Sequence, residues 1–286
     1  MKYLDVVGPD KPTSRIGLGT WQFGSREWGY GEGYSSHEAT RIVARAVEAG
    51  ITLFDTAEAY GFGRSERILG TALAECGALE TSVIATKLFP VFPIAPVVGS
   101  RGRASAGRLG VSSIDLYQVH QPNPVIRDGT TMAGLRVLQN DGTVGCVGVS
   151  NYSLSRWQEA ERELGRPVVS NQVQFSLAHA GPLDDLVPYA ADNDRVVIAW
   201  SPLAQGLLSC RYDAGNPPSG AVRRLNPLFV EENLERAAGL LDALRDIAGG
   251  HDVTPAQVAL AWLIHQLRVV AIPGASSVEQ VDKNAE

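Results

Sequence analysis

Four side chains near the ends of apolar runs could act together on a carbonyl group. Asp55 ends the run ITLFD and Tyr60 lies in the turn after it, Lys87 ends SVIATK, and His120 ends IDLYQVH. A phenol is a weak acid in water, with a pKa of about 10. A charged lysine beside Tyr60 would lower that pKa, and a carboxylate paired with the lysine would keep the lysine charged. Tyr60 could then protonate a carbonyl oxygen that His120 orients by a hydrogen bond.

This set of residues predicts the reduction of C=O, or the oxidation of an alcohol in the reverse direction. None of the four side chains supplies a hydride, so the reaction requires a cofactor. Each residue also has a structural explanation, because Asp55 could start a loop, Lys87 could be solvated and His120 could be a core histidine. Their occurrence at the same end of successive strands favours a shared site.

Apolar runs that alternate with amphipathic segments predict the scaffold for these residues. The expected strands are 14–20, 51–56, 82–87, 114–120, 143–151, 169–175, 196–202 and 269–274. The expected helices are 35–50, opened by a Ser35–Glu38 capping box, then 65–76, 131–140, 153–163, 182–192, 232–248 and 254–266. The last of these opens with Thr254, Pro255 and Gln257, which is typical of a helix start. Segment 94–110 should hold the third helix, but it is rich in glycine and only its end has a helical pattern.

The alternation predicts an α/β fold, a (β/α)8 TIM barrel that spans residues 1–286 as a single domain. We expect an N-terminal hairpin-like extension and a long functional loop, 202–231, after the seventh strand. A two-domain dinucleotide-binding protein is the competing fold, but no GxGxxG follows any of the strands.

Polar and aromatic residues at the remaining strand ends predict a nicotinamide site. Ser150, Asn151 and Gln172 offer the hydroxyl and amide groups that a carboxamide needs, and Trp200 offers a flat face for the ring. The segment SPLAQGLL can wrap a pyrophosphate. IPGASSVEQ places a helix N-terminus where an anion could bind, with Ser277 as the N-cap.

These motifs together resemble the aldo-keto reductase superfamily over nearly the whole chain. LFDTAEAYGFGRSERILG is similar to the first signature of the family and GCVGVSNYS to the second; TK, IDLYQVH, SNQVQF, AWSPLAQGLL and IPGASSVEQ are similar to later landmarks. The resemblance matches Asp55, Tyr60, Lys87 and His120 to the catalytic tetrad of the family. It implies NADPH as the hydride donor, NADP(H) as the cofactor, and small-molecule aldehydes or ketones as substrates.

With this resemblance, two further sets of site residues are expected. The cofactor-binding set is Thr20, Trp21, Ser150, Asn151, Gln172, Trp200, Ser201, Leu203, Gln205, Gly206, Gly274, Ser276, Gln280 and Asn284. The apolar wall of the substrate pocket is expected to consist of Trp21, Phe23, Trp28, Phe89 and Phe92.

Some positions depart from the family pattern. Gly145 replaces an arginine that is common before the second signature, and Gln280 replaces a frequent arginine near the adenosine phosphate. Gly274 matches a basic residue of some branches, and Lys283 matches a frequent glutamate near the adenine. The chain stops at Glu286, inside the expected final helix. We therefore expect a weaker preference for NADPH over NADH than in a relative with the arginine.

Composition excludes several other classes of function. Hydrophobic residues make up 44% of the chain, enough for a sizeable core, and a net charge of −6 argues against binding nucleic acid or a membrane surface. No run is apolar enough to span a membrane. The cysteines, Cys76, Cys146 and Cys210, form no CxxC pair, which favours a reducing cytoplasm and no structural zinc.

Two other functions are compatible with parts of the sequence. An NADP(H)-binding redox sensor or regulatory subunit with incidental turnover is the alternative to a reductase. A metal-dependent hydrolase would need several ligands at the strand ends, where His120 is the only histidine, so no metal is expected. The arginines Arg101, Arg103 and Arg108 suggest a solvated helix face. The sequence does not predict an oligomeric state.

Overall fold

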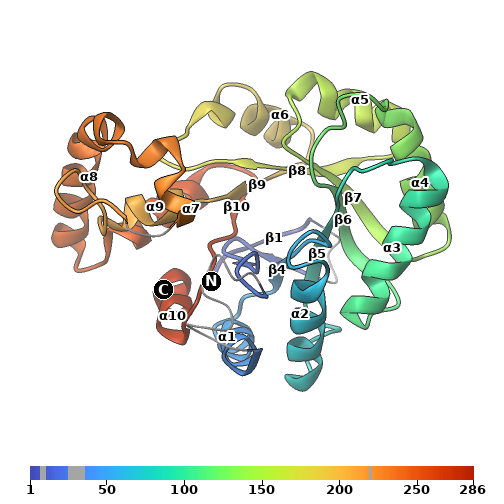
Figure 1. The fold of residues 1–286 in the computed structure, drawn as a ribbon, viewed down its shortest axis with the longest axis horizontal. Coiled ribbons are helices and arrows are strands. Elements are labelled where there is room, and N and C mark those ends of the chain that lie inside the picture. Colours follow the sequence, from blue (N-terminus) through green and yellow to red (C-terminus); the bar gives the residue numbers. More distant parts are fainter. Residues whose placement is uncertain (7–10, 25–35, 219–220) are drawn as a thin grey trace.

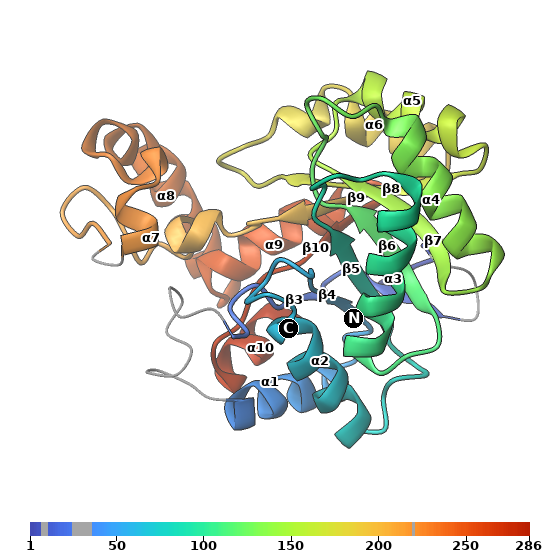
Figure 2. The ribbon, with the colours of Figure 1, turned by 45° about the vertical axis from the view of Figure 1, so that its right-hand side comes forward.

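The computed structural model describes residues 1–6, 11–24, 36–218 and 221–286. Strands β1 and β2 form a short antiparallel hairpin, and strands β3 to β10 form an eight-stranded sheet in which chain order is also the spatial order. Each neighbouring pair of that sheet is parallel. Its two edges are joined by parallel bridges from Ile16 to Ala271 and from Gly19 to Gly274. The sheet therefore curls into the expected (β/α)8 barrel, with helices around its outside (Figures 1 and 2).

The expected strands and helices are present, with changes in their lengths. The strands are β1 Tyr3–Leu4, β2 Thr13–Ser14, β3 Leu18–Gly19, β4 Leu53–Asp55, β5 Val83–Leu88, β6 Ile114–Val119, β7 Val144–Ser150, β8 Val168–Gln174, β9 Val196–Trp200 and β10 Val269–Ala271. The α-helices are α1 Ser36–Glu48, α2 Arg64–Glu75, α3 Ala95–Leu109, α4 Asp128–Asn140, α5 Leu154–Leu164, α6 Leu186–Asp192, α7 Ala221–Arg224, α8 Glu231–His251, α9 Pro255–His265 and α10 Val278–Ala285. The proposed N-cap Ser35 lies outside the described residues.

Two hydrophobic layers hold the barrel together. Inside it, apolar side chains of β4 to β6, of β9, and of β10 and the residue after it pack on one another: Leu53, Val83, Ala85, Leu116, Val196, Ile198, Val270 and Ile272. Outside it, the apolar stripes of the helices cover the other face of the strands; in α1 these are Ala39, Ile42, Val43 and Ala46. Hydrophobic strands buried on both faces leave the polar strand ends at the rim as the place for chemistry.

The third helix is complete, although only its end had a helical pattern in the sequence. Helix α3 runs from Ala95 to Leu109, and its buried positions include Gly99, Gly102 and Ser105. Small residues give a weak hydrophobic signal but let neighbouring helices approach closely. On the facing helix α2, a Cβ atom at Gly70 would lie 2.2 Å from the Leu109 carbonyl oxygen.

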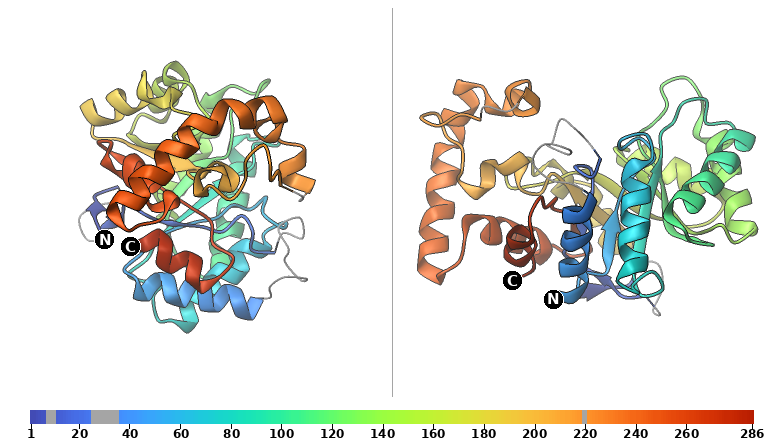
Figure 3. Two further views of the ribbon diagram at one scale, coloured as in Figure 1. Left: turned by 90° about the vertical axis from the view of Figure 1, so that its left-hand side faces the viewer. Right: turned by 60° about the horizontal axis from the view of Figure 1, so that its bottom comes forward.

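The connection after β9 builds a separate layer at one side of the molecule. It contains the 3-10 helices η3 (Ala204–Ser209) and η4 (Pro227–Phe229), followed by α8 and α9. A capping box between Thr254 and Gln257, with Pro255 in the first turn, starts α9 as the sequence indicated. Helix α8 lies at the edge away from α3 and α4, and the two chain ends lie close together in every view (Figures 1 and 3). In the described part of the chain, no helix combines the length and hydropathy needed for a membrane span.

Candidate active site

Strands β4, β5 and β6 bring three of the predicted residues to one end of the barrel. Asp55 ends β4, Lys87 lies one residue before the end of β5, and His120 follows β6 directly. The Lys87 ammonium donates to Asp55 Oδ1 at 2.5 Å, to the Thr56 carbonyl at 2.9 Å and to the Tyr60 hydroxyl at 3.4 Å. Lys87 is 0% exposed and Asp55 2%. All three donor positions of this buried ammonium are therefore used within the site.

The second oxygen of Asp55 is held by two glutamine amides. Gln172 Nε2 donates to Asp55 Oδ2 at 2.7 Å, and Gln118 Nε2 lies 3.4 Å from the same oxygen. Gln118 was not among the residues predicted from the sequence. A glutamine in the middle of the apolar strand IDLYQV was the available signal, and strand register pairs it with Lys87. Two neutral donors keep a buried carboxylate satisfied without a second cation.

Lys87 stays charged in this environment, but its effect on Tyr60 is smaller than expected. Burial opposes the charge of Lys87 most strongly, yet the interactions with Asp55 and Tyr60 together outweigh it and raise the pKa of the lysine. The pKa of the Tyr60 phenol is also raised, which corrects the sequence-based expectation that it would be lowered. Burial raises this pKa most, Lys87 pulls it down, and the charge of Asp55 raises it again. Tyr60 therefore holds its proton at neutral pH.

His120 lies beside Tyr60 as a neutral imidazole. The two rings meet edge to face with their centroids 5.6 Å apart, and Phe89 packs on the same imidazole at 5.8 Å. Burial, and then the positive charge of Lys87, lower the pKa of His120 to about 3. Its Nδ1 atom is buried and has no hydrogen-bond partner among the described residues. A neutral imidazole has one N–H to donate, so His120 can orient an oxygen without adding charge.

The expected carboxamide-binding residues lie together on the ends of β7, β8 and β9. Ser150 donates to the Gln172 carbonyl at 2.8 Å, and Asn151 Nδ2 donates to the His120 carbonyl at 3.2 Å. Trp200 Nε1 donates to Asn151 Oδ1 at 3.1 Å. Asn151 has a φ of 61°, a left-handed conformation that asparagine tolerates better than most residues. The amide of Asn151 thus joins the ends of β6 and β9.

The segment after β9 turns sharply, as wrapping a pyrophosphate would require. Ser201, Gln205 and Gly206 have φ values of 49°, 55° and 99°, so consecutive backbone groups point in unusual directions. Leu203 lies between them and is partly buried. Thr20 is fully buried and donates its hydroxyl to the Asp55 carbonyl at 2.9 Å. Its hydroxyl therefore supports the strand that carries Asp55.

The start of α10 differs from the sequence-based expectation. Ser277 caps the helix by accepting from the Gln280 N–H, as expected. The side-chain carbonyl of Gln280 accepts from the Ser276 N–H at 2.9 Å, so it covers one of the backbone donors expected to face an anion. Gln22, next to Gly274, donates to the Ala275 carbonyl at 2.6 Å. Asn284 lies one turn beyond Gln280 on the same helix face.

The model of the Aldo/keto reductase family matches residues 15–286. The chain belongs to that family. A Mycobacterium tuberculosis protein described as an uncharacterized oxidoreductase is 60% identical over 284 residues, covering 99% of this chain and 87% of the relative. A glycerol dehydrogenase from Gluconobacter oxydans superimposes with a TM-score of 0.89 at 30% identity, over 99% of this chain and 89% of the other. A Klebsiella pneumoniae aldo-keto reductase solved in complex with NADPH gives 0.76 at 26% identity, over 96% and 85%.

As a member of the aldo/keto reductase family, the protein is an oxidoreductase. The four residues that the sequence resemblance matched to the tetrad of that family lie together in the cluster described above. Among the described residues, no group of three or more His, Cys, Asp or Glu side chains is placed to hold a metal ion.

The aromatic residues expected around the substrate are divided between the rim and the core. Trp21 is half-exposed, with its ring 6.3 Å from that of Tyr60, and Phe89 packs on His120. Phe92 is largely exposed in the loop after β5 and has a φ of 46°. Phe23 is 0% exposed and belongs to the hydrophobic core. Trp28 lies outside the described residues.

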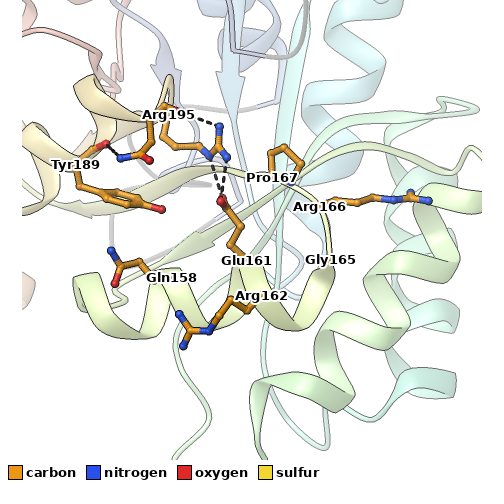
Figure 4. A pocket seen from close by; sticks show the side chains of 9 residues that line it. Gln158, Glu161, Arg162, Gly165, Arg166, Pro167, Tyr189 and Arg195 are labelled. Atoms are coloured by element: carbon orange, nitrogen blue, oxygen red, sulfur yellow. Dashed lines mark hydrogen bonds and ion pairs between the residues drawn. The ribbon is translucent and has the colours of Figure 1, made fainter.

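A hollow of about 610 Å³ lies at the opposite end of the barrel, near the amino ends of β8 and β9 (Figure 4). Glu161 on α5 accepts two hydrogen bonds from Arg195, at 2.9 and 3.0 Å, while Arg162 and Arg166 point away from that pair in different directions. These arginines do not converge on one point. The hollow therefore contributes no group to the site around Tyr60.

Proposed function

We propose that this protein is an NADPH-dependent carbonyl reductase that acts on a small aldehyde or ketone and runs in reverse as an alcohol dehydrogenase. The observation that carries the proposal is the buried Lys87, which contacts both Asp55 and the Tyr60 hydroxyl next to a neutral His120. Family membership and the NADPH complex of the Klebsiella pneumoniae relative support it.

In this proposal, Tyr60 is the proton donor. Its pKa is raised, so the phenol arrives protonated, and the ammonium of Lys87 stabilises the phenolate that remains after proton transfer. Asp55 keeps Lys87 charged and directed. His120 stays neutral and donates to the carbonyl oxygen, which holds that oxygen next to the Tyr60 hydroxyl.

The residues at the ends of β7, β8 and β9 fit a nicotinamide cofactor. Gln172 uses its NH2 group on Asp55, which leaves its carbonyl oxygen to accept from a carboxamide, and Asn151 can add a second contact. Trp200 is held by its N–H bond to Asn151, so its indole face has a fixed direction. The turn of Ser201 to Gly206 and the start of α10 would hold the phosphates. NADPH, when bound there, supplies the hydride.

The rim residues support a substrate with an apolar portion beside its carbonyl. Trp21 and Phe89 border the cluster, and both present apolar surface near Tyr60 and His120. The glycerol dehydrogenase from Gluconobacter oxydans, a structural neighbour, is named for a small polyol. A panel of aldehydes, ketones and polyols therefore defines the first substrate screen, with the consumption of NADPH followed by absorbance.

The variant Tyr60→Phe tests the proposal. We expect NADPH affinity to change by less than about tenfold, or 1.4 kcal/mol. Reduction should slow by at least about 10²-fold, which is the scale of a lost general acid. Single-turnover oxidation of bound NADPH by 4-nitrobenzaldehyde, compared with steady-state turnover, separates a reductase from a redox sensor. A Phe variant that turns over at the parental rate would remove Tyr60 from the mechanism.

A further inference from the structure

A second set of charges lies directly behind Tyr60 and Lys87. Glu58, two residues before Tyr60, has a side chain that is 10% exposed. It accepts from the Phe89 N–H at 2.5 Å and from two nitrogens of Arg101, at 2.5 and 3.1 Å. Arg101 also donates to the Val91 carbonyl at 3.1 Å. One carboxylate therefore ties the Tyr60 turn to the end of β5 and to helix α3.

Arg108 makes the matching connection two turns further along α3. Its Nε donates at 2.5 Å to Glu66, a fully buried residue in the first turn of α2. The other oxygen of Glu66 accepts from the Thr86 hydroxyl at 2.6 Å. Gly63, at the N-cap of α2, has a φ of 79°, and a Cβ atom there would lie 2.6 Å from Arg108. The glycine therefore leaves the space through which Arg108 reaches Glu66.

The contacts of Arg101 and Arg108 involve residues on both sides of Tyr60 and of Lys87 in the chain. Glu58 and Gly63 bracket Tyr60 in the chain, while Thr86 and Phe89 bracket Lys87. The two pairs are also linked, since Arg108 Nη2 lies 4.0 Å from Glu58 Oε2. This arrangement corrects the sequence-based suggestion that Arg101 and Arg108 form part of a solvated face.

We propose that Arg101 and Arg108, acting through Glu58 and Glu66, are positioning residues that fix the Tyr60 hydroxyl against the Lys87 ammonium. This inference rests on the proposed function, in which those two groups transfer and stabilise a proton. Neither arginine touches the reacting atoms. Arg101 holds Glu58, which binds Phe89, and Arg108 holds Glu66, which binds Thr86, so both arginines act on residues near Tyr60 and Lys87. A displacement of about 1 Å at a reacting group can cost about 10²-fold in rate.

Stability alone does not account for the buried charges. Burial raises the pKa of Glu58, and Arg101 only partly offsets this effect. A carboxylate with a raised pKa binds its proton more tightly in the folded state than in the unfolded state, so charging it at neutral pH costs folding free energy. Buried ion pairs are in general weak stabilisers compared with apolar residues of similar volume. A bidentate arginine–carboxylate pair does, however, fix the relative orientation of the two side chains.

The test compares Arg101→Met with Arg103→Met. Arg103 lies on the same helix, but its side chain is 54% exposed and it pairs with Asp141. We expect kcat for reduction to fall by about 10- to 100-fold in Arg101→Met, with KM and the NADPH dissociation constant changed less than about threefold, because the loss concerns alignment. Arg103→Met should retain the parental kcat.

Three further variants distinguish the effect of the arginine charge from that of its bidentate geometry, and test each ion pair separately. Arg101→Lys should recover part of the lost kcat, since it restores the charge but not the two-pronged geometry. Glu58→Gln combined with Arg101→Met should be no slower than the slower single variant, because both changes break one connection. Arg108→Met should repeat the loss in kcat through the connection to Thr86.

Amide hydrogen exchange provides a measurement that does not depend on turnover. Peptides covering residues 56–63 and 88–90 should exchange faster in Arg101→Met than in the parent, and Arg103→Met should leave them unchanged. A parental kcat in Arg101→Met, an equal loss in Arg103→Met, or unchanged exchange in these peptides would overturn the positioning role. If Tyr60→Phe turns over normally, the proposed reduction fails, and the exchange data alone then decide whether the arginines fix the turn.

Discussion

Strands β4 to β6 and strands β7 to β10 contribute to the candidate active site in different ways. The first group places a buried ion pair, Lys87 with Asp55, under the Tyr60 turn, and a further layer of ion pairs lies behind it. The second group contributes neutral side chains, such as Asn151 and Trp200, and a backbone turn with several positive φ values.

The difference follows from the cost of burying each kind of group. A buried charge must have its partners in place at all times, since an unpaired one destabilises the fold by several kcal/mol. A neutral amide or a backbone N–H near the surface can exchange protein, water and ligand partners at little cost. The residues of β4 to β6 (the first side), which are expected to transfer the proton, are therefore already paired with one another. The residues of β7 to β10 (the second side), which are expected to hold the cofactor, can exchange their present partners for it. Gln172 belongs to both, because it reaches Asp55 from β8.

The largest expected effect comes from breaking the ion pair of the first side. Lys87→Met leaves the Asp55 carboxylate buried without a cation, so the free energy of unfolding should fall by about 3–5 kcal/mol. Urea denaturation at pH 7 measures it. Adding Asp55→Asn to the same chain should recover most of the loss. If Lys87→Met keeps the parental stability, Asp55 and Lys87 are not the preformed pair that distinguishes the two sides.

The preference for NADPH over NADH should change when a residue near β10 is substituted, while the ion pair of Lys87 and Asp55 stays intact. Gln280→Arg replaces a neutral amide at the start of α10 with a cation that can pair with the 2′-phosphate of NADPH. One charged hydrogen bond contributes about 1.5–3 kcal/mol, so the ratio of kcat/KM for NADPH to that for NADH should rise by roughly 10- to 100-fold. The gain should shrink with added salt. An unchanged ratio would show that this turn does not contact the phosphate.

The neutral state of His120 predicts how stability changes with pH. Its pKa is about 3 in the folded protein and starts from 6.5, so the unfolded chain binds a proton first as the pH falls. Below about pH 6.5, this residue alone should lower the free energy of unfolding by about 1.4 kcal/mol per pH unit.

Denaturation of the parent and of His120→Gln at pH 7, 6, 5 and 4 isolates this term. The difference between the two curves should change steadily below pH 6.5, because the glutamine variant has no proton to bind at this position. A constant difference would mean that His120 titrates alike in the folded and unfolded chains.

The smallest expected effect concerns the bond between Trp200 and Asn151. Trp200→Phe keeps an aromatic face but removes the N–H that donates to Asn151 Oδ1. A neutral hydrogen bond contributes about 1 kcal/mol, so NADPH affinity should weaken by roughly fivefold, as measured by quenching of protein fluorescence. Turnover at saturating NADPH should stay close to parental. A large loss of kcat would show that the second side also aligns the reacting groups.

Much of this protein could be predicted from the order of its residues. Strand patterns such as SVIATK and IDLYQVH, each ending in a polar residue, indicated both the barrel and the position of its chemistry. Parallel strands bring their carboxyl ends to one rim, so residues far apart in the chain are brought together by the pattern alone. Thr254 and Gln257 likewise predicted the start of α9, because capping depends on neighbours three residues apart.

Other features depended on tertiary contacts. The glycines of α3 concealed a complete helix, because small residues contribute through close packing and not through helix propensity: Gly102 lies against Leu138 of α4, and Gly70 of α2 lies against Leu109. Arg101 and Arg108 have the same side chain as the exposed Arg103, and only the packing of α3 against the Tyr60 turn gives them buried carboxylate partners. The direction of the pKa shift at Tyr60 was also decided there. Lys87 and Asp55 act on it with opposite signs, and burial, which no local pattern encodes, determines the balance.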